Sequence, residues 1–152
     1  MPALNTIGTF GRSTMTERTY ILAPVGIIHS DLTNRHAAPR QGYEGAPEAW
    51  VEVSSDVADG LLGIRSGDEI IVITWLDRAR RETLQVHPGR SPNAPLTGVF
   101  ATRSPDRPNP VGLHRVTVLE IAGQRLKVGP IEAIDGTPVI DIKPVLSRSD
   151  DG

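Results

Sequence analysis

The sequence predicts a mainly β fold, a small single-domain β-barrel of about seven short strands with one or two short helices. Glycine contributes 15 and proline 13 of the 152 residues, well above the background of roughly 12% for the two together. Several apolar segments have the length of strands and are bounded by turn residues. Strands do not alternate with helical patterns, which excludes a doubly wound parallel sheet and favours a barrel or sandwich.

The first half of the chain contains three expected strands and one expected helix. Residues 20–30 are apolar and β-branched without helical spacing, and residues 49–55 alternate apolar and polar positions. Residues 55–64 favour a short helix with Ser55 as its N-cap, because Val57 and Leu61 are one helical turn apart. Residues 69–76 form a continuous apolar run, which predicts a buried strand.

The second half adds strands separated by turns. Residues 82–87 alternate again, residues 88–98 have the composition of a loop, and residues 98–102 lead into a proline-rich segment. Residues 111–129 predict a hairpin that turns at 122–124. Residues 130–143 predict a tight turn at Asp135 and Gly136 followed by a last strand.

A chain of 152 residues is long enough for one core, which we place at residues 20–146. Residues 1–19 are expected to be a flexible leader and residues 147–152 a loose tail. No apolar run approaches the roughly 18 to 20 residues that cross a bilayer, so no membrane span is expected. The absence of cysteine removes disulfides and thiolate sites and is consistent with a cytoplasmic protein.

Positive charge is concentrated in the middle of the chain, although the formal net charge is −2. Between Arg78 and Arg115 seven arginines face two acids, Glu82 and Asp106. This region can attract an anion, or its arginines can be scattered over a solvated surface, and charge alone does not separate the two interpretations.

Familiar catalytic motifs are absent. The four histidines (His29, His36, His87 and His114) have no partner at metal-ligand spacing, so no metal site is expected. No nucleophile elbow and no glycine-rich nucleotide loop occurs. Asp135 and Asp141 could form a carboxylate pair, but an aspartate before glycine more commonly stabilises its own turn.

Polar residues are instead concentrated in constrained loops between strands. The longest reads FATRSPDRPNPVGL over residues 100–113, and its three prolines leave the backbone few conformations. Four others carry PRQ (39–41), WLDRARR (75–81), HPGR (87–90) and DGTPVIDIKP (135–144). Loops held by a strand scaffold are where binding residues tend to lie.

Taken together, these motifs resemble the TrmO-like (TsaA-like) family over about residues 21–144. The resemblance implies a small β-barrel, a homodimer, and S-adenosylmethionine as cofactor. It implies methylation of the exocyclic nitrogen of threonylcarbamoyl-adenosine in tRNA, and hence a tRNA partner.

The resemblance also implies site residues by position in the motifs. The implied cofactor-binding residues are Pro39, Arg40, Gln41, Asp77, Arg78, Arg103, Leu113, Asp135, Gly136, Thr137 and Pro138. The implied substrate-binding residues are Arg107, Asn109 and Lys143, and Asp135 is the candidate proton acceptor. Arginine and lysine suit phosphate contacts, and asparagine suits a base edge.

Two positions depart from the family pattern: Asp77 replaces a common histidine, and Val145 replaces a tyrosine. Two alternatives therefore stay open beside the tRNA methyltransferase. One is a barrel that binds S-adenosylmethionine or RNA without turnover. The other is a paralogue that methylates a different small substrate.

Overall fold

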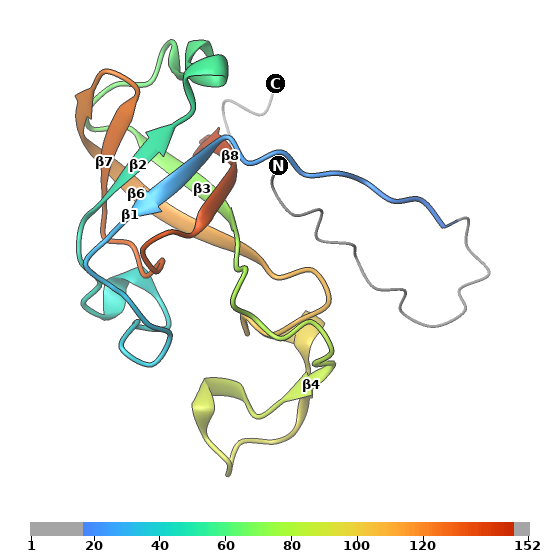
Figure 1. Ribbon diagram of the computed structural model, residues 1–152. Helices are drawn as coiled ribbons and strands as arrows, with labels where there is room; N and C mark the ends of the chain where they lie inside the picture. The colour runs from blue at the N-terminus through green and yellow to red at the C-terminus, as the bar shows by residue number, and fades with distance from the viewer. Residues whose placement is uncertain (1–16, 148–152) are drawn as a thin grey trace.

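Six antiparallel strands close into a barrel in the order β1-β2-β7-β6-β3-β8 (Figure 1). The structure is a computed structural model, and it describes residues 17–147. The barrel strands are β1 (Gly26–His29), β2 (Ala49–Val53), β3 (Glu69–Trp75), β6 (Val111–Ala122), β7 (Arg125–Gly129) and β8 (Pro138–Pro144). A separate pair, β4 (Gln85–Val86) and β5 (Thr97–Gly98), lies outside the barrel. The predicted fold class is confirmed.

The barrel closes because alternate residues of its strands point inward, and most of these residues are apolar. In β2 and β3 buried positions alternate with partly exposed ones. The resulting core contains Ile28, Ala49, Val51, Val53, Ile70, Val72, Val116, Val118, Leu126, Val128, Ile131, Ala133 and Val139. Burial of this apolar surface is the main stabilising contribution to such a fold.

The two predicted turns are confirmed. Strands β6 and β7 form an antiparallel hairpin that turns through Gly123, whose φ of 62° favours glycine. Gly136, with φ of 83°, forms the turn before β8. Strand β8 then pairs with both β1 and β3, which closes the barrel.

Two strand predictions were wrong in extent. The first strand begins at Gly26 and not at residue 20, because pairing with β2 and β8 begins at Gly26 and the residues before Val25 have no strand partner in the described part of the chain. Tyr20, Ile21 and Leu22 are consequently exposed despite their apolar side chains. The strand expected over 82–87 shrinks to two residues, Gln85–Val86, which pair with β5 and not with the barrel.

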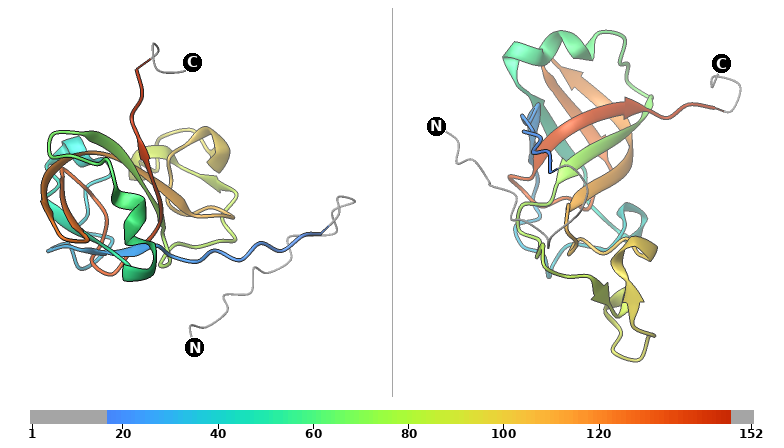
Figure 2. Two further views of the ribbon diagram at one scale, coloured as in Figure 1. Left: turned by 90° about the horizontal axis from the view of Figure 1, so that it is seen from above. Right: turned by 90° about the vertical axis from the view of Figure 1, so that its right-hand side faces the viewer.

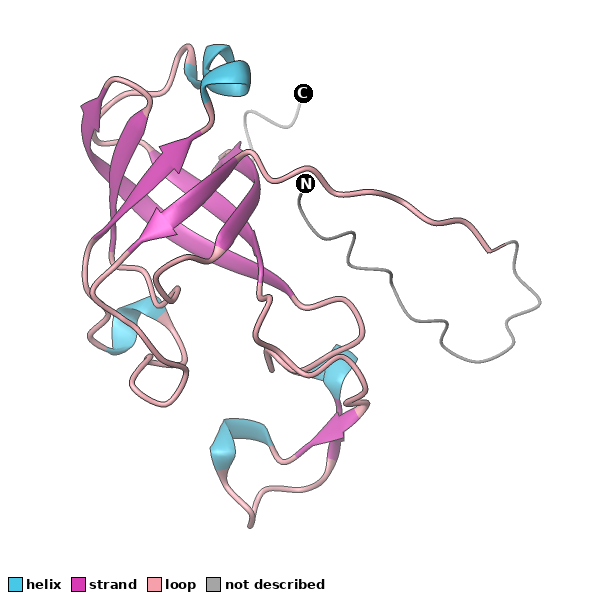
Figure 3. Cartoon of the chain, in the orientation of Figure 1, coloured by secondary structure: helices cyan, strands magenta, loops and turns pink. Residues whose placement is uncertain are grey.

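The described helices are all short 3₁₀ helices: η1 (Gly42–Glu44), η2 (Ser55–Leu61), η3 (Pro88–Arg90) and η4 (Val99–Ala101) (Figure 3). Helix η2 confirms the predicted helix, but its N-cap is Ser54 and not Ser55. Residues 1–16 of the expected leader and 148–152 of the expected tail lie outside the described residues. No helix in residues 17–147 is long and apolar enough to cross a membrane.

The long loops gather at one end of the barrel, and helix η2 and the β6–β7 turn lie at the other (Figures 1 and 2). The β4–β5 pair projects beyond the loop end. All five motif loops of the sequence start or finish near this end, so the fold brings together segments that are far apart along the chain.

Candidate functional site

The loop end of the barrel encloses a cleft of about 1010 Å³, within the range of ligand sites. Its walls come from residues 35–44, 76–79, 86–89 and 100–109. Its floor comes from residues 111–114 of β6, from 132–134 and from Thr137. Two motif loops that are about 60 residues apart, 39–41 and 100–113, therefore line one cavity.

A buried polar chain lies at the floor of the cleft. Thr74 Oγ1 lies 2.7 Å from His114 Nε2, and His114 Nδ1 lies 2.6 Å from Glu132 Oε1. Thr74 is 0% exposed, and the side chains of His114 and Glu132 are 4% and 17% exposed. The interior thus changes from apolar to polar where the barrel meets the cleft, and every buried polar atom in the described residues has a partner.

Gly112 explains how β6 accommodates this polar chain. It lies opposite Thr74 in the β3–β6 register. A side chain there would collide with the Thr74 hydroxyl and lie 2.8 Å from His114 Nε2. The glycine of the proline-rich motif is therefore required by the close approach of Thr74 and His114.

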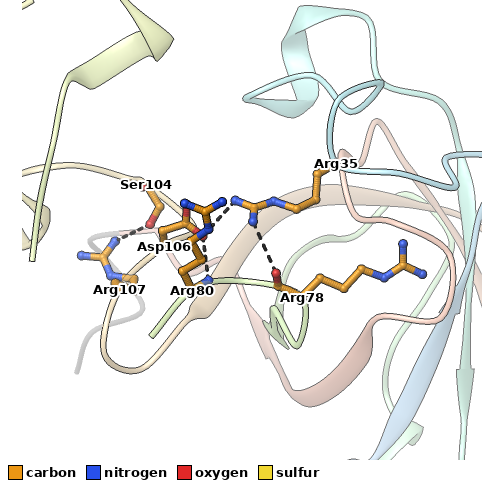
Figure 4. Close-up of polar contacts among 6 residues, drawn as sticks. All are labelled: Arg35, Arg78, Arg80, Ser104, Asp106 and Arg107. Carbon is orange, nitrogen blue, oxygen red and sulfur yellow. Dashed lines mark hydrogen bonds and ion pairs between the residues drawn. The ribbon is translucent and has the colours of Figure 1, made fainter. Parts of the chain in front are cut away.

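Asp106 joins three loops at the rim (Figure 4). Its Oδ1 accepts a hydrogen bond from Arg35 Nη2 at 2.9 Å and another from the backbone N–H of Arg80 at 2.8 Å. Arg35 Nη1 also donates to the carbonyl of Arg78 at 3.3 Å. One carboxylate therefore fixes the proline-rich loop against the segments around residues 35 and 78–80.

Arg107 is used within its own loop. Its Nη1 donates to the carbonyl of Thr102 at 3.1 Å and its Nη2 to the carbonyl of Val99 at 2.7 Å. Nη1 also donates to the carbonyl of Ser104 at 3.2 Å (Figure 4). Arg103 differs, because it is exposed and its side chain has no hydrogen bond or ion pair within residues 17–147. The structure thus separates a loop-stabilising arginine from one that is available to a ligand.

A second loop-stabilising arginine lies beside the proline-rich segment. Arg81 Nε donates to the carbonyl of Pro108 at 2.7 Å, and its Nη2 donates to Asn109 Oδ1 at 3.1 Å. Its guanidinium also lies 5.1 Å from the ring centre of Trp75, a cation–π contact. These contacts hold the predicted substrate residue Asn109 in one orientation.

Most of the predicted site residues line the cleft: Pro39, Arg40, Gln41, Asp77, Arg78, Arg103, Arg107, Asn109, Leu113 and Thr137. Asp135, Gly136, Pro138 and Lys143 do not line it. The binding role of each residue stays a prediction.

Asp135 and Lys143 have other partners. Asp135 Oδ1 accepts the backbone N–H of Ser30 at 3.0 Å, and its side chain borders a smaller hollow of about 600 Å³. Lys143 forms an ion pair of 3.2 Å with Asp141 on the outside of β8. The Asp135 side chain therefore ties its turn to the segment that follows β1, and no hydrogen bond to its own turn is seen in the described residues.

Sequence reasoning missed Glu132 and the coupling of His114 to it. An inward-facing histidine two residues before the buried Val116 was a signal for His114, because polar residues at core positions need partners. Nothing in the sequence around Glu132 marks it, since its partner lies across the barrel. Within the described residues, no group of three or more His, Asp or Glu side chains is placed to bind a metal.

A small closed β-barrel whose loops surround a cleft at one end is an architecture typical of ligand-binding barrels. Residues 27–151 match the family described as tRNA-methyltransferase O N-terminal domain, and the chain belongs to this family.

Curated relatives agree with this family. A probable S-adenosyl-L-methionine-binding protein of Archaeoglobus fulgidus is 45% identical over 129 residues, which are 85% of this chain and 35% of that protein. An S-adenosyl-L-methionine-binding protein of the same organism is 44% identical over 124 residues, 81% of this chain and 87% of that protein. The chain thus spans about a third of the first relative and most of the second.

The fold also agrees with a solved structure. A crystal structure of TrmO from Pseudomonas aeruginosa superposes with a TM-score of 0.68 at 29% identity. The superposition covers 89% of this chain and 60% of that one. The resemblance to the TrmO-like family inferred from the motifs is confirmed.

Proposed function

We propose that this protein binds S-adenosylmethionine in the cleft and transfers its methyl group to the exocyclic nitrogen of threonylcarbamoyl-adenosine in tRNA. The observation that carries the proposal is the convergence of loops 39–41 and 100–113 on one cavity with arginines at its rim. The names of the relatives support the cofactor, and the family description supports the class of reaction and a tRNA substrate.

The groups that line the cleft fit this cofactor. Its carboxylate requires an arginine fork, its ribose and amine require acceptors, and its adenine requires an apolar surface. The guanidinium of Arg40 already forms an ion pair of 3.6 Å with Glu44, whereas Arg103 has no hydrogen-bond or ion-pair partner within residues 17–147. We therefore assign the carboxylate to Arg103. Asp77 and the exposed Phe100 and Leu113 supply an acceptor and apolar surface at the same cleft.

The bound cofactor supplies an electrophilic methyl group on a sulfonium. This chain's own residues then have two tasks. The rigid loop 100–113 holds the acceptor in line with the methyl group, because orientation lowers such a barrier by up to roughly 7 to 11 kcal/mol in ideal cases. Asn109, which Arg81 holds in place, contacts the modified base.

We also propose that the protein works as a homodimer in the cytoplasm. The exposed apolar residues Tyr20, Ile21 and Leu22, and Phe100 at the cleft, suit a subunit interface. Light scattering of the full chain measures the oligomeric state directly, and a monomer at micromolar concentration would contradict the proposed homodimer.

Calorimetry tests cofactor binding. We expect wild-type protein to bind S-adenosylmethionine and Arg103→Ala to weaken the Kd at least tenfold, because a hydrogen bond to a charged group contributes about 1.5–3 kcal/mol. Arg115→Ala is the matched control, since Arg115 pairs with Glu69 on the barrel wall and does not line the cleft. Its Kd should stay within twofold. An absence of binding heat from folded protein would contradict the proposal.

The acceptor is tested separately. Purified protein, S-adenosylmethionine and tRNA that contains threonylcarbamoyl-adenosine are incubated, and the digested nucleosides are analysed by mass spectrometry. We expect this nucleoside to gain one methyl group. Cofactor binding without any methylated nucleoside would support a binding module or another acceptor instead.

A further inference from the structure

The three hydrogen-bonded side chains at the cleft floor, Thr74, His114 and Glu132, have an unusual order of burial. Hydroxyl, imidazole and carboxylate follow one another as in a serine–histidine–aspartate triad. The burial is reversed, however, because the Thr74 hydroxyl is fully buried, whereas His114 and Glu132 both line the cleft. Thr74 therefore has no access to a substrate, and Glu132, whose side chain is 17% exposed against 4% for His114, is the more accessible of the other two.

The hydrogen bonds among these three side chains run in one direction, from the Thr74 hydroxyl through His114 to the carboxylate of Glu132. With Glu132 ionised and His114 neutral, one tautomer satisfies both contacts: His114 donates from Nδ1 to Glu132 Oε1, and its Nε2 accepts from the Thr74 hydroxyl. The hydrogen bonds from Thr74 to His114 and from His114 to Glu132 thus fix one oxygen of Glu132 in a single orientation. Outer hydrogen-bond partners orient metal-ligating histidines and carboxylates in the same way.

The other oxygen of Glu132 is available to a ligand. Oε2 accepts no hydrogen bond within residues 17–147. Glu132 itself lines the cleft, and 17% of its side chain is exposed. A partly buried carboxylate oxygen that is open to a cleft favours a hydrogen-bond donor from whatever binds there.

The other carboxylates of the cleft are arranged differently. Glu44 accepts the backbone N–H of Arg40 and pairs with its guanidinium, and Asp106 Oδ1 accepts two hydrogen bonds at the rim. Asp77 is exposed and has no side-chain hydrogen bond or ion pair in the described part of the chain. Glu132 alone among these four is both oriented by a buried group and open to the cavity.

We propose that Glu132 is a catalytic residue, and that its Oε2 accepts the proton of the acceptor nitrogen during methyl transfer; the inference rests on the function proposed above. The nitrogen–carbon bond forms as the carbon–sulfur bond breaks, and the sulfur keeps the electron pair. The proton leaves the nitrogen for Glu132, which returns it to solvent through the cleft. His114 and Thr74 are positioning residues.

Glu132→Gln tests the assignment, because it keeps the shape of the side chain and removes its ability to take up a proton. We expect the single-turnover rate at saturating cofactor and tRNA to fall at least 100-fold, in line with general-base contributions of about 10² to 10⁴. The Kd for S-adenosylmethionine, measured by calorimetry, should stay within threefold. Glu69→Gln is the matched control, since Glu69 is an exposed ion-pair partner of Arg115 outside the cleft, and we expect neither quantity to change.

Thr74→Val tests the positioning role, because it removes the hydroxyl and keeps the branched shape. We expect a fall of about tenfold in rate at saturating substrate, no change in KM, and an unchanged Kd for the cofactor. A purely structural role would instead lower the melting temperature and leave the turnover of the folded fraction intact. Glu132→Asp, which keeps the charge, should recover part of the rate and provides a second test if Glu132→Gln does not fold.

Two results would overturn the inference while the proposed function stands. One is a wild-type rate in Glu132→Gln. The other is a cofactor Kd weakened more than tenfold with a normal rate at saturation, which would make Glu132 a cofactor contact. A wild-type protein that binds no cofactor and methylates no tRNA would overturn both the proposed function and this inference.

Discussion

The barrel and the loops at its cleft end are stabilised by different interactions. We call these loops, which contain residues 35–44, 76–79, 86–89 and 100–109, the loop layer. In the barrel, side chains such as Ile28, Val72 and Leu126 are fully buried, and apolar burial fixes their positions. In the loop layer, Asp106 and Arg107 fix the backbone through hydrogen bonds to carbonyl and amide groups. Apolar burial tolerates moderate changes of shape, whereas a hydrogen-bonded loop depends on particular atoms.

The loop layer itself contains the same contrast on a smaller scale. Arg103 and Arg107 lie four residues apart in one loop, yet Arg107 donates to three carbonyls and Arg103 to none within the described residues. Two identical side chains therefore have separate tasks, one in the fold and one toward a ligand. Mutations can test whether this division holds.

The largest expected effect lies in the barrel. Leu126→Ala removes a fully buried side chain from β7 and should lower the free energy of unfolding by about 2–5 kcal/mol. Urea denaturation followed by circular dichroism measures it. The control Leu62→Ala changes a side chain that is 95% exposed, and should alter stability by less than about 0.5 kcal/mol. Equal costs at both sites would contradict the assigned core.

A smaller effect is expected in the loop layer. Arg107→Ala leaves three carbonyls without their charged donor and should cost about 1.5–3 kcal/mol of stability. Arg103→Ala in the same loop should cost less than about 0.5 kcal/mol. Thermal denaturation of the two variants side by side checks the contrast. If Arg103→Ala proves the more destabilising, the division of tasks between the two arginines is wrong.

The smallest effect concerns the prolines. Pro108→Ala should lower stability by about 0.4–1 kcal/mol, because the unfolded chain gains conformational freedom. It should also weaken S-adenosylmethionine binding measurably, since Pro108 stands between Arg103 and Leu113, the two predicted cofactor contacts. Calorimetry and thermal denaturation measure both quantities. Unchanged affinity would show that the loop needs only its hydrogen bonds to Arg81 and Arg107 for rigidity.

The barrel could be predicted from sequence because its rules are local. Alternating apolar residues marked β2, a continuous apolar run marked β3, and glycines marked the turns at Gly123 and Gly136. Residues 20–25 were assigned to a strand in error, because apolar composition does not reveal whether a partner strand lies opposite.

The site was predictable only where motifs marked it. Arg40, Arg103 and Leu113 were found from the family resemblance and line the cleft. The pairing of His114 with Glu132 follows from how residues 130–137 return across the barrel end, which no spacing in the sequence encodes. The use of Arg107 within its own loop was equally invisible, because charge patterns do not distinguish a carbonyl partner from a phosphate.

The Thr74–His114–Glu132 chain also has a consequence for how the protein acquires its site during folding. Its two hydrogen bonds join residues that are 40 and 18 positions apart in sequence. Contacts of such separation form only after the loops between them have closed, at a considerable cost in chain entropy. The orientation of Glu132 therefore depends on the pairing of β3 with β6, and a chain in which these strands have not paired would present the motif loops without an ordered cleft floor.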